Sequence, residues 1–294
     1  LFIASMSAMK ETKPTKSNDN DESLSLSSRN FGHFSESSYA CNSTEKEFTR
    51  IVTLSSEAVD DASLISVTCN AEVYCVSYMG EKAVVKVLKN QETKISENRL
   101  LNEHKLTCGV SHHGIRRAIA RALFKEKQAL LLEWFDGTTL KRLGKLRIRS
   151  FLQISREIVS ALVALHDNGV VNKNINTENI LVDFDTTAIK IIGNSMCSRF
   201  YEKNCSLGNP NYLQGNLHFI SPEQTGNIDQ IVDFRSDFYS LGIVIYYMLT
   251  GDLPYTSDSP SELMHMHMFQ DIPRLNRVDS SIPMPICDMV AKLM

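Results

Sequence analysis

Short apolar runs separated by polar breaks mark the first patterned part of the chain. Residues 64–68 (LISVT), 72–78 (EVYCVSY) and 82–89 (KAVVKVLK) are rich in β-branched and aromatic residues, which favour strands. The segment 79–81 (MGE) separates the second run from the third like a tight turn. The pattern therefore predicts an antiparallel meander.

A helix and two further strands are predicted next. Residues 92–108 have a partial apolar face at helical spacing. Residues 116–125 and 128–135 are two more strand-like runs, and the second is apolar enough to be central in a sheet.

Helices dominate the pattern after Gly137. Residues 150–169 carry apolar side chains at helical spacing, with Ser150 and Gln153 as an expected capping box and Gly169 where a left-handed residue ends a helix.

The last patterned segments are a ribbon and a buried helix. Residues 180–183 and 188–192 predict two short strands, and residues 236–251 are apolar on almost every face. Five strands with one helix, followed by a mainly helical half, predict an α+β chain with two lobes.

The chain divides by composition into a tail and two lobes. Residues 1–48 are rich in Ser, Asn, Lys and Glu, which predicts a disordered tail. We place the strand-rich lobe at 49–136 and the helical lobe at 137–294. Because the chain starts at Leu1 and stops at Met294 inside an apolar pattern, we expect a fragment with an incomplete second lobe.

Composition excludes several classes of protein. The net charge is −3 and no basic cluster is present, which argues against a nucleic-acid partner. No apolar run approaches the ~20 residues of a membrane span. Seven cysteines without a C-x-x-C pair predict a reducing, cytoplasmic location.

Two stretches carry a family resemblance. Residues 170–183 (VVNKNINTENILVD) resemble the protein-kinase catalytic loop, H-R-D-x-K-x-x-N-I-L. Residues 215–255 (GNLHFISPEQTG… to …GDLPY) are similar to the kinase-like domain that opens large multi-domain sensor hybrid histidine kinases. The resemblance covers about residues 64–294. It implies a two-lobed protein-kinase fold with a five-stranded antiparallel N-lobe and a mainly helical C-lobe.

Three matched positions imply a nucleotide site. Lys86 matches the lysine that holds the α- and β-phosphates, Glu103 its ion-pair partner, and Asn179 the asparagine that binds magnesium. The alternatives are a surface lysine, a solvated glutamate and a loop-capping asparagine.

The resemblance also implies a hinge for adenine. Glu133 and Phe135 would present backbone groups to the base, after Leu132 at the gatekeeper position. We interpret Trp134 as a packing residue.

The glycine-rich loop of the family is missing. Ser66, Thr68 and Ala71 stand at its three glycine positions. Glycines there let backbone N–H groups approach a phosphate, and the β-branched Thr68 obstructs that approach most.

The catalytic positions depart from the family as well. Asn174 replaces the catalytic aspartate, Asn176 the loop lysine and Gly193 the metal-binding aspartate. The sequence DFD at 183–185 comes too soon after Asn179 to serve as the metal motif. A magnesium site is therefore doubtful.

These departures predict a pseudokinase. We expect a regulatory or docking domain that binds ATP weakly or not at all. Its partners would be proteins, or ATPase and sensor modules of the same polypeptide. The alternatives are an active serine/threonine kinase that recruits Asp183 or Asp185 to metal, and a decaying gene copy without a selected role.

The resemblance implies two scaffold contacts in the C-lobe. Asp237 matches a buried aspartate that hydrogen-bonds the catalytic-loop backbone. Glu223 matches a glutamate that pairs with a late arginine, which would lie beyond Met294, so we expect Glu223 to be unpaired.

Overall fold

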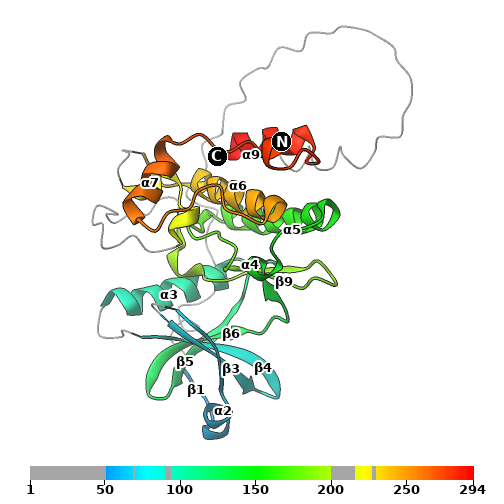
Figure 1. Ribbon diagram of the computed structural model, residues 1–294. Helices are drawn as coiled ribbons and strands as arrows, with labels where there is room; N and C mark the ends of the chain where they lie inside the picture. Colours follow the sequence, from blue (N-terminus) through cyan, green and yellow to red (C-terminus); the bar gives the residue numbers. More distant parts are fainter. Residues whose placement is uncertain (1–50, 69–70, 90–93, 200–215, 227–229) are drawn as a thin grey trace. The chain divides into compact units, whose positions relative to one another are not determined.

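The computed structural model describes residues 51–68, 71–89, 94–199, 216–226 and 230–294 (Figure 1). The tail predicted at 1–48 lies outside these residues, so that prediction stays open. The structure is α+β, with a strand-rich N-lobe followed by a mainly helical C-lobe, as the sequence predicts.

The N-lobe is built on one six-stranded sheet in the order β1-β5-β6-β4-β3-β2. The five predicted antiparallel strands are present, and one helix, α3, lies among them. The elements in chain order are β1 (Ile51–Thr53), α2 (Ser56–Asp60), β2 (Ser63–Val67), β3 (Ala71–Tyr78), β4 (Glu81–Leu88), α3 (Lys94–Gly109), β5 (Ala118–Phe124) and β6 (Lys127–Glu133).

The sixth strand, β1, was not predicted. It pairs in parallel with β5 through only three residues, too few for alternation of apolar and polar residues to be recognised.

The β3–β4 hairpin fixes the register of the central strands. Met79 and Gly80 both have positive φ, 54° and 83°, the backbone shape that two-residue hairpin turns prefer. The turn sets Lys86 opposite Val73. Val84 lies opposite Leu132 on β6, so the residues implied for nucleotide binding share one region of the sheet.

Strand β4 is buried on both faces. One face packs Val85 and Val87 against Phe124 and Leu131. The other packs Val84 against Leu132 and against Leu100 of α3. Helix α3 is therefore held on the sheet face that also carries Lys86, because residues 84 and 86 point the same way along a strand.

The C-lobe consists of helices with small ribbons between them. Its elements are β7 (Thr138–Thr139), α4 (Leu140–Leu143), α5 (Ile148–Asp167), β8 (Val170–Val171), β9 (Ile180–Val182), β10 (Ile189–Ile191), η3 (Asn194–Met196), β11 (Ser198–Arg199), η5 (Leu217–Phe219), η6 (Pro222–Thr225), α6 (Phe234–Thr250), α7 (Pro260–Phe269), α8 (Leu275–Val278) and α9 (Met284–Leu293).

Helix α5 begins earlier than the sequence predicts. Its N-cap is Arg147 and no side chain caps it, so the predicted capping box of Ser150 and Gln153 is wrong. Ser150 lies inside the first turn. The predicted end is confirmed, because Gly169 follows the helix with a φ of 69°.

Helix α6 is the buried helix of the C-lobe, with Ile243, Val244 and Ile245 fully covered. A β-carbon at Gly242 would lie 2.6 Å from Met294 Cγ, so glycine permits the close approach of the end of α9. Despite this apolar character, none of the helices in the described ranges is both long and apolar enough to cross a bilayer.

Candidate functional site

An ion pair joins the sheet to helix α3. Lys86 Nζ lies 2.6 Å from Glu103 Oε2, and the two side chains are only 15% and 3% exposed. Their burial makes this a charge-assisted contact with little solvent screening. The structure thus brings Lys86 and Glu103 together, while their role in nucleotide binding stays a prediction.

Helix α3 is also tied to the segment that follows Gly193. Asn102 Nδ2 donates to the Cys197 carbonyl at 2.6 Å, and α3 packs against η3. These contacts connect the N-lobe to the C-lobe and hold Glu103 at their boundary.

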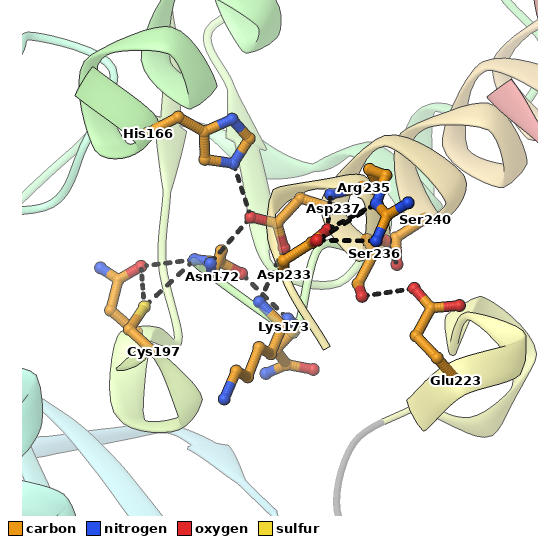
Figure 2. Close-up of polar contacts among 12 residues, drawn as sticks. His166, Asn172, Lys173, Cys197, Glu223, Asp233, Arg235, Ser236, Asp237 and Ser240 are labelled. Atoms are coloured by element: carbon orange, nitrogen blue, oxygen red, sulfur yellow. Dashed lines mark hydrogen bonds and ion pairs between the residues drawn. The ribbon is translucent and has the colours of Figure 1, made fainter. Parts of the chain in front are cut away.

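Asp237 fixes the loop between β8 and β9. Its carboxylate accepts hydrogen bonds from the backbone N–H groups of Asn172 at 2.8 Å and Lys173 at 2.7 Å. His166 Nε2 lies 2.8 Å from the same carboxylate, which is fully buried (Figure 2). The contact implied for Asp237 by the resemblance is therefore confirmed. Asp237 thus holds the loop in a conformation in which Lys173 has a positive φ of 65°.

Inside this loop, side-chain amides bond to one another. Asn176 Nδ2 donates to the Asn174 backbone carbonyl at 3.0 Å and to Asn174 Oδ1 at 3.1 Å. Asn179 Nδ2 donates to the same Asn174 carbonyl at 3.0 Å. Asn174 Nδ2 in turn donates a long bond of 3.4 Å to the Gly193 carbonyl.

A second layer of amides lies beneath the loop. Asn172 is fully buried, and its Nδ2 donates to Asn194 Oδ1 at 3.0 Å and to Cys197 Sγ at 3.5 Å. Burial raises the pKa of the Cys197 thiol well above its usual value, so this layer is neutral. We call Asn172, Asn174, Asn176, Asn179 and Asn194 the amide centre.

A side chain at position 193, where the resemblance would require a carboxylate, would collide with the Asn179 side chain. Gly193 has a φ of 76°, and a β-carbon built on it would lie 2.8 Å from Asn179 Oδ1. The Asn179 amide thus occupies the space into which a side chain at position 193 would extend.

The amide centre does not fit a magnesium ion. Mg²⁺ is bound in proteins through carboxylates and phosphates, whereas the amide centre supplies only amides and the neighbouring Gly193 supplies no side chain. Among the described residues, no group of three His, Cys, Asp or Glu side chains is placed to hold a metal. An amide is also unable to take a proton from a hydroxyl group at neutral pH.

Asp183 is engaged elsewhere. Its carboxylate accepts from Thr186 Oγ1 at 2.6 Å and from the Asp185 N–H at 3.0 Å, closing the β9–β10 turn. These bonds lower the pKa of Asp183. Using Asp183 as a metal ligand would require breaking this turn.

The loop at the missing glycines is closed by a threonine. Thr68 Oγ1 accepts from the Ala71 N–H at 3.0 Å, and the Thr68 N–H donates to the Ala71 carbonyl at 2.8 Å. Residues 69–70 lie outside the described ranges. The Ala71 N–H, at a position where the family's backbone meets phosphate, is therefore already satisfied.

The predicted hinge is tied to its surroundings through Glu133. The Glu133 carboxylate accepts from the Arg117 N–H at 2.7 Å and from Lys190 Nζ at 2.8 Å. The Glu133 N–H donates to the Arg117 carbonyl at 3.1 Å, so this N–H is not free to bond a base. Lys190 Nζ also lies 5.9 Å from the centre of the Phe135 ring.

The expectation of an unpaired Glu223 is wrong. Ser236 Oγ at the start of α6 donates to Glu223 Oε1 (Figure 2). A neighbouring hydroxyl therefore satisfies the carboxylate, a contact that the family's motif spacing does not include.

One buried charge, Arg116, was missed by the sequence analysis. It is 8% exposed and lies just before β5. The only signal in the sequence is its position two residues before Ala118, since side chains two apart on an extended segment share a face.

Known proteins match most of this chain. The protein kinase domain family model matches residues 70–293. The probable serine/threonine-protein kinase PknB of Lactococcus lactis is 27% identical over 223 residues, which is 74% of this chain and 35% of that protein. A probable serine/threonine-protein kinase of Clostridium acetobutylicum is 28% identical over 220 residues, 73% of this chain and 33% of that protein.

A third relative matches a shorter stretch. The serine/threonine-protein kinase PrkC of Bacillus subtilis is 29% identical over 167 residues, covering 55% of this chain and 25% of that protein. The chain thus spans about a third or less of the length of these relatives. Because the family model covers well over half of the chain, including both the Lys86–Glu103 pair and the amide centre, the chain belongs to the protein kinase superfamily.

Proposed function

We propose that this domain transfers no phosphoryl group and serves as a regulatory or docking module, a pseudokinase. The observation that carries the proposal is the amide centre. Asn174, at the position of the catalytic base, has its side chain bonded to Asn176 and to the Gly193 carbonyl.

The size of the lost contributions supports inactivity. Loss of a general base costs ~10²–10⁴ in rate. Loss of the carboxylate that holds the metal removes the main electrostatic stabilisation of a reaction that depends on charge and positioning. A typical kinase turnover of about 1–100 per second would fall to background.

Weak ATP binding is part of the proposal. The Lys86–Glu103 pair favours a phosphate contact, because the lysine is already oriented. The closed Thr68–Ala71 loop and the engaged Glu133 N–H oppose tight binding. We infer a low affinity that does not require Mg²⁺.

The partners would be proteins rather than nucleic acid or a membrane. The curated relatives are about three times as long as the matched region, which supports a domain within a larger signalling protein. We propose a cytoplasmic location for that protein. ATPase or sensor modules of the same polypeptide are the proposed targets of regulation. The bonds of Asp237 support a rigid docking surface, since they hold the loop without substrate.

The second candidate is an active serine/threonine kinase with substitute residues. The intact Lys86–Glu103 pair favours it. It requires a carboxylate for the metal, and Asp183 would have to leave its turn, while Asp185 is exposed at the tip of that turn.

Radiolabelled ATP separates the two candidates. The purified chain is incubated with labelled ATP, Mg²⁺ or Mn²⁺, and generic serine and threonine substrates, next to a Lys86→Ala variant. We expect both proteins to give the same background label. Label transfer by the natural chain that Lys86→Ala abolishes would reject the inactive domain in favour of the kinase.

A further inference from the structure

Arg116 carries a buried positive charge that is not in an ion pair with any of the described residues. Its Nε has no acceptor among the described residues. The ion pairs formed within the described ranges do not include Arg116. Burying an unpaired charge costs free energy, so an anion bound next to this guanidinium would be stabilised.

The side chain lies beside the residues implied for the nucleotide. The Arg116 N–H donates to the Ile191 carbonyl at 3.0 Å, just before Gly193 along the chain. Arg117 is exposed and Ala118 buried, so Arg116 shares the face of Ala118. Ala118 lies opposite Leu132, and Leu132 opposite Val84, on the face that carries Lys86.

The local charges do not balance. Lys86 pairs with Glu103, and Lys190 pairs with Glu133. Both carboxylates act on Arg116 from a distance, and burial lowers its pKa to about 10, which leaves it protonated at neutral pH. Counted over the described residues alone, these three cations have two carboxylates between them, and Arg116 is the cation left without an ion pair.

We propose that Arg116 and Lys86 form an anion-binding site at the lobe boundary, and that its ligand is a nucleoside phosphate free of divalent cation. Both cations lie around the same carboxylate, Glu103. The guanidinium has donors to spare, and phosphate oxygens match its fork geometry.

A metal-free ligand follows from the donor set. Asn174, Asn179 and Gly193 provide no carboxylate for Mg²⁺, so the phosphate charge must be met by protein cations. Mg²⁺ in solution would compete with Arg116 for the same oxygens. This inference rests on the proposed function, because it names the ligand of a site that performs no transfer.

Calorimetric titration of the whole chain tests the site. ATP is titrated into the protein, first in buffer with EDTA and then in buffer with excess Mg²⁺. Neutral adenosine is the third ligand. We expect ATP to bind more tightly in EDTA. Arg116→Gln should weaken ATP binding in EDTA by at least about tenfold, the size of one charge-assisted hydrogen bond, and leave adenosine binding unchanged.

Arg117→Gln is the matched control, because Arg117 is the exposed neighbour and uses only its backbone at Glu133. It should bind ATP like the natural chain. Circular dichroism checks that Arg116→Gln folds. If it does not, Arg116→Lys, which keeps the charge, must retain the preference for metal-free ATP.

Several results would overturn the proposal. They are ATP binding only with Mg²⁺, ATP binding in neither buffer, and Arg116→Gln binding ATP as well as or better than the natural chain. Tighter binding would mean that the guanidinium fills the ligand's space. Label transfer from radiolabelled ATP is measured separately, so a failure of this binding site and a failure of the inactive-domain proposal are distinguished.

Discussion

The side chain of Asn179 occupies the space that a side chain at position 193 would need. A β-carbon on Gly193 would lie 2.8–2.9 Å from the Asn179 amide atoms. In the family these two positions hold magnesium together. Here the asparagine and the glycine fit each other only because one of them has no side chain.

Restoring an aspartate at position 193 should therefore destabilise the domain. Gly193→Asp adds a clash with Asn179 to the strain of a positive φ. Gly80→Asp is the control, because Gly80 also has a positive φ but open space around it. We expect urea unfolding to show a loss about 1–3 kcal/mol larger for Gly193→Asp than for Gly80→Asp. Equal losses would mean that Asn179 moves aside freely.

The Lys86–Glu103 pair should matter for stability, in contrast to an exposed pair of the same length. Lys86→Met leaves Glu103 buried without its partner, and we expect a loss of about 2–4 kcal/mol. Lys141→Met breaks a pair of equal 2.6 Å length whose side chains are 59% and 51% exposed. That loss should stay below about 1 kcal/mol. Similar losses in chemical denaturation would contradict this account of the buried pair.

Asp237 should be the most sensitive polar residue of the catalytic-loop scaffold. Asp237→Asn replaces one acceptor oxygen by a donor that faces the N–H groups of Asn172 and Lys173. We expect a loss of about 2–4 kcal/mol in the free energy of unfolding. Asp252 is exposed and lies just beyond the other end of α6. Asp252→Asn should change the free energy of unfolding by less than about 0.5 kcal/mol. A mild effect of Asp237→Asn would show that the loop is held by other contacts.

Acid should weaken the domain through His267. This buried side chain contacts Tyr239 Oη at 2.9 Å, lies beside Tyr255 and His218, and has its pKa lowered to about 4 mainly by burial. Between about pH 6.5 and pH 4 the unfolded chain binds a proton that the folded chain does not. Stability contributed by neutral His267 is therefore present above this window and is lost as the pH falls through it.

The variant His267→Gln isolates that contribution. Its free energy of unfolding should fall less than that of the natural chain between pH 7 and pH 4.5, by about 2–3 kcal/mol. His265→Gln, on the exposed side of the same helix, should follow the natural chain. Parallel curves for all three proteins would rule out His267 as the source.

Periodicity predicted most of the N-lobe and the two longest helices of the C-lobe. The five antiparallel strands, helices α5 and α6, and the turn before β4 follow from apolar patterns between residues close in the sequence. Strand β1 was missed because three residues carry no period. The start of α5 was misplaced because Ser150 and Gln153 fit a capping motif, whereas the helix begins two residues earlier, at Ile148.

The candidate site was predictable only as far as motif spacing reaches. Spacing located Lys86, Glu103, Asn174, Asn179 and Gly193. It does not reveal that the amides bond to one another, since such bonds depend on rotamers and on contacts between distant segments. The hydrogen bond from Ser236 to Glu223 and the surplus charge of Arg116 also depend on tertiary packing, so motif spacing does not reveal them.

We propose that no carboxylate of this domain holds a divalent cation against nucleotide phosphates. Crystals soaked with Mn²⁺ and a non-hydrolysable ATP analogue test it through the anomalous signal of manganese. We predict no manganese peak coordinated by a carboxylate at the lobe boundary, with any bound phosphate contacting Lys86. A manganese ion held by Asp183, Asp185 or another carboxylate of the chain beside the phosphates would contradict the account.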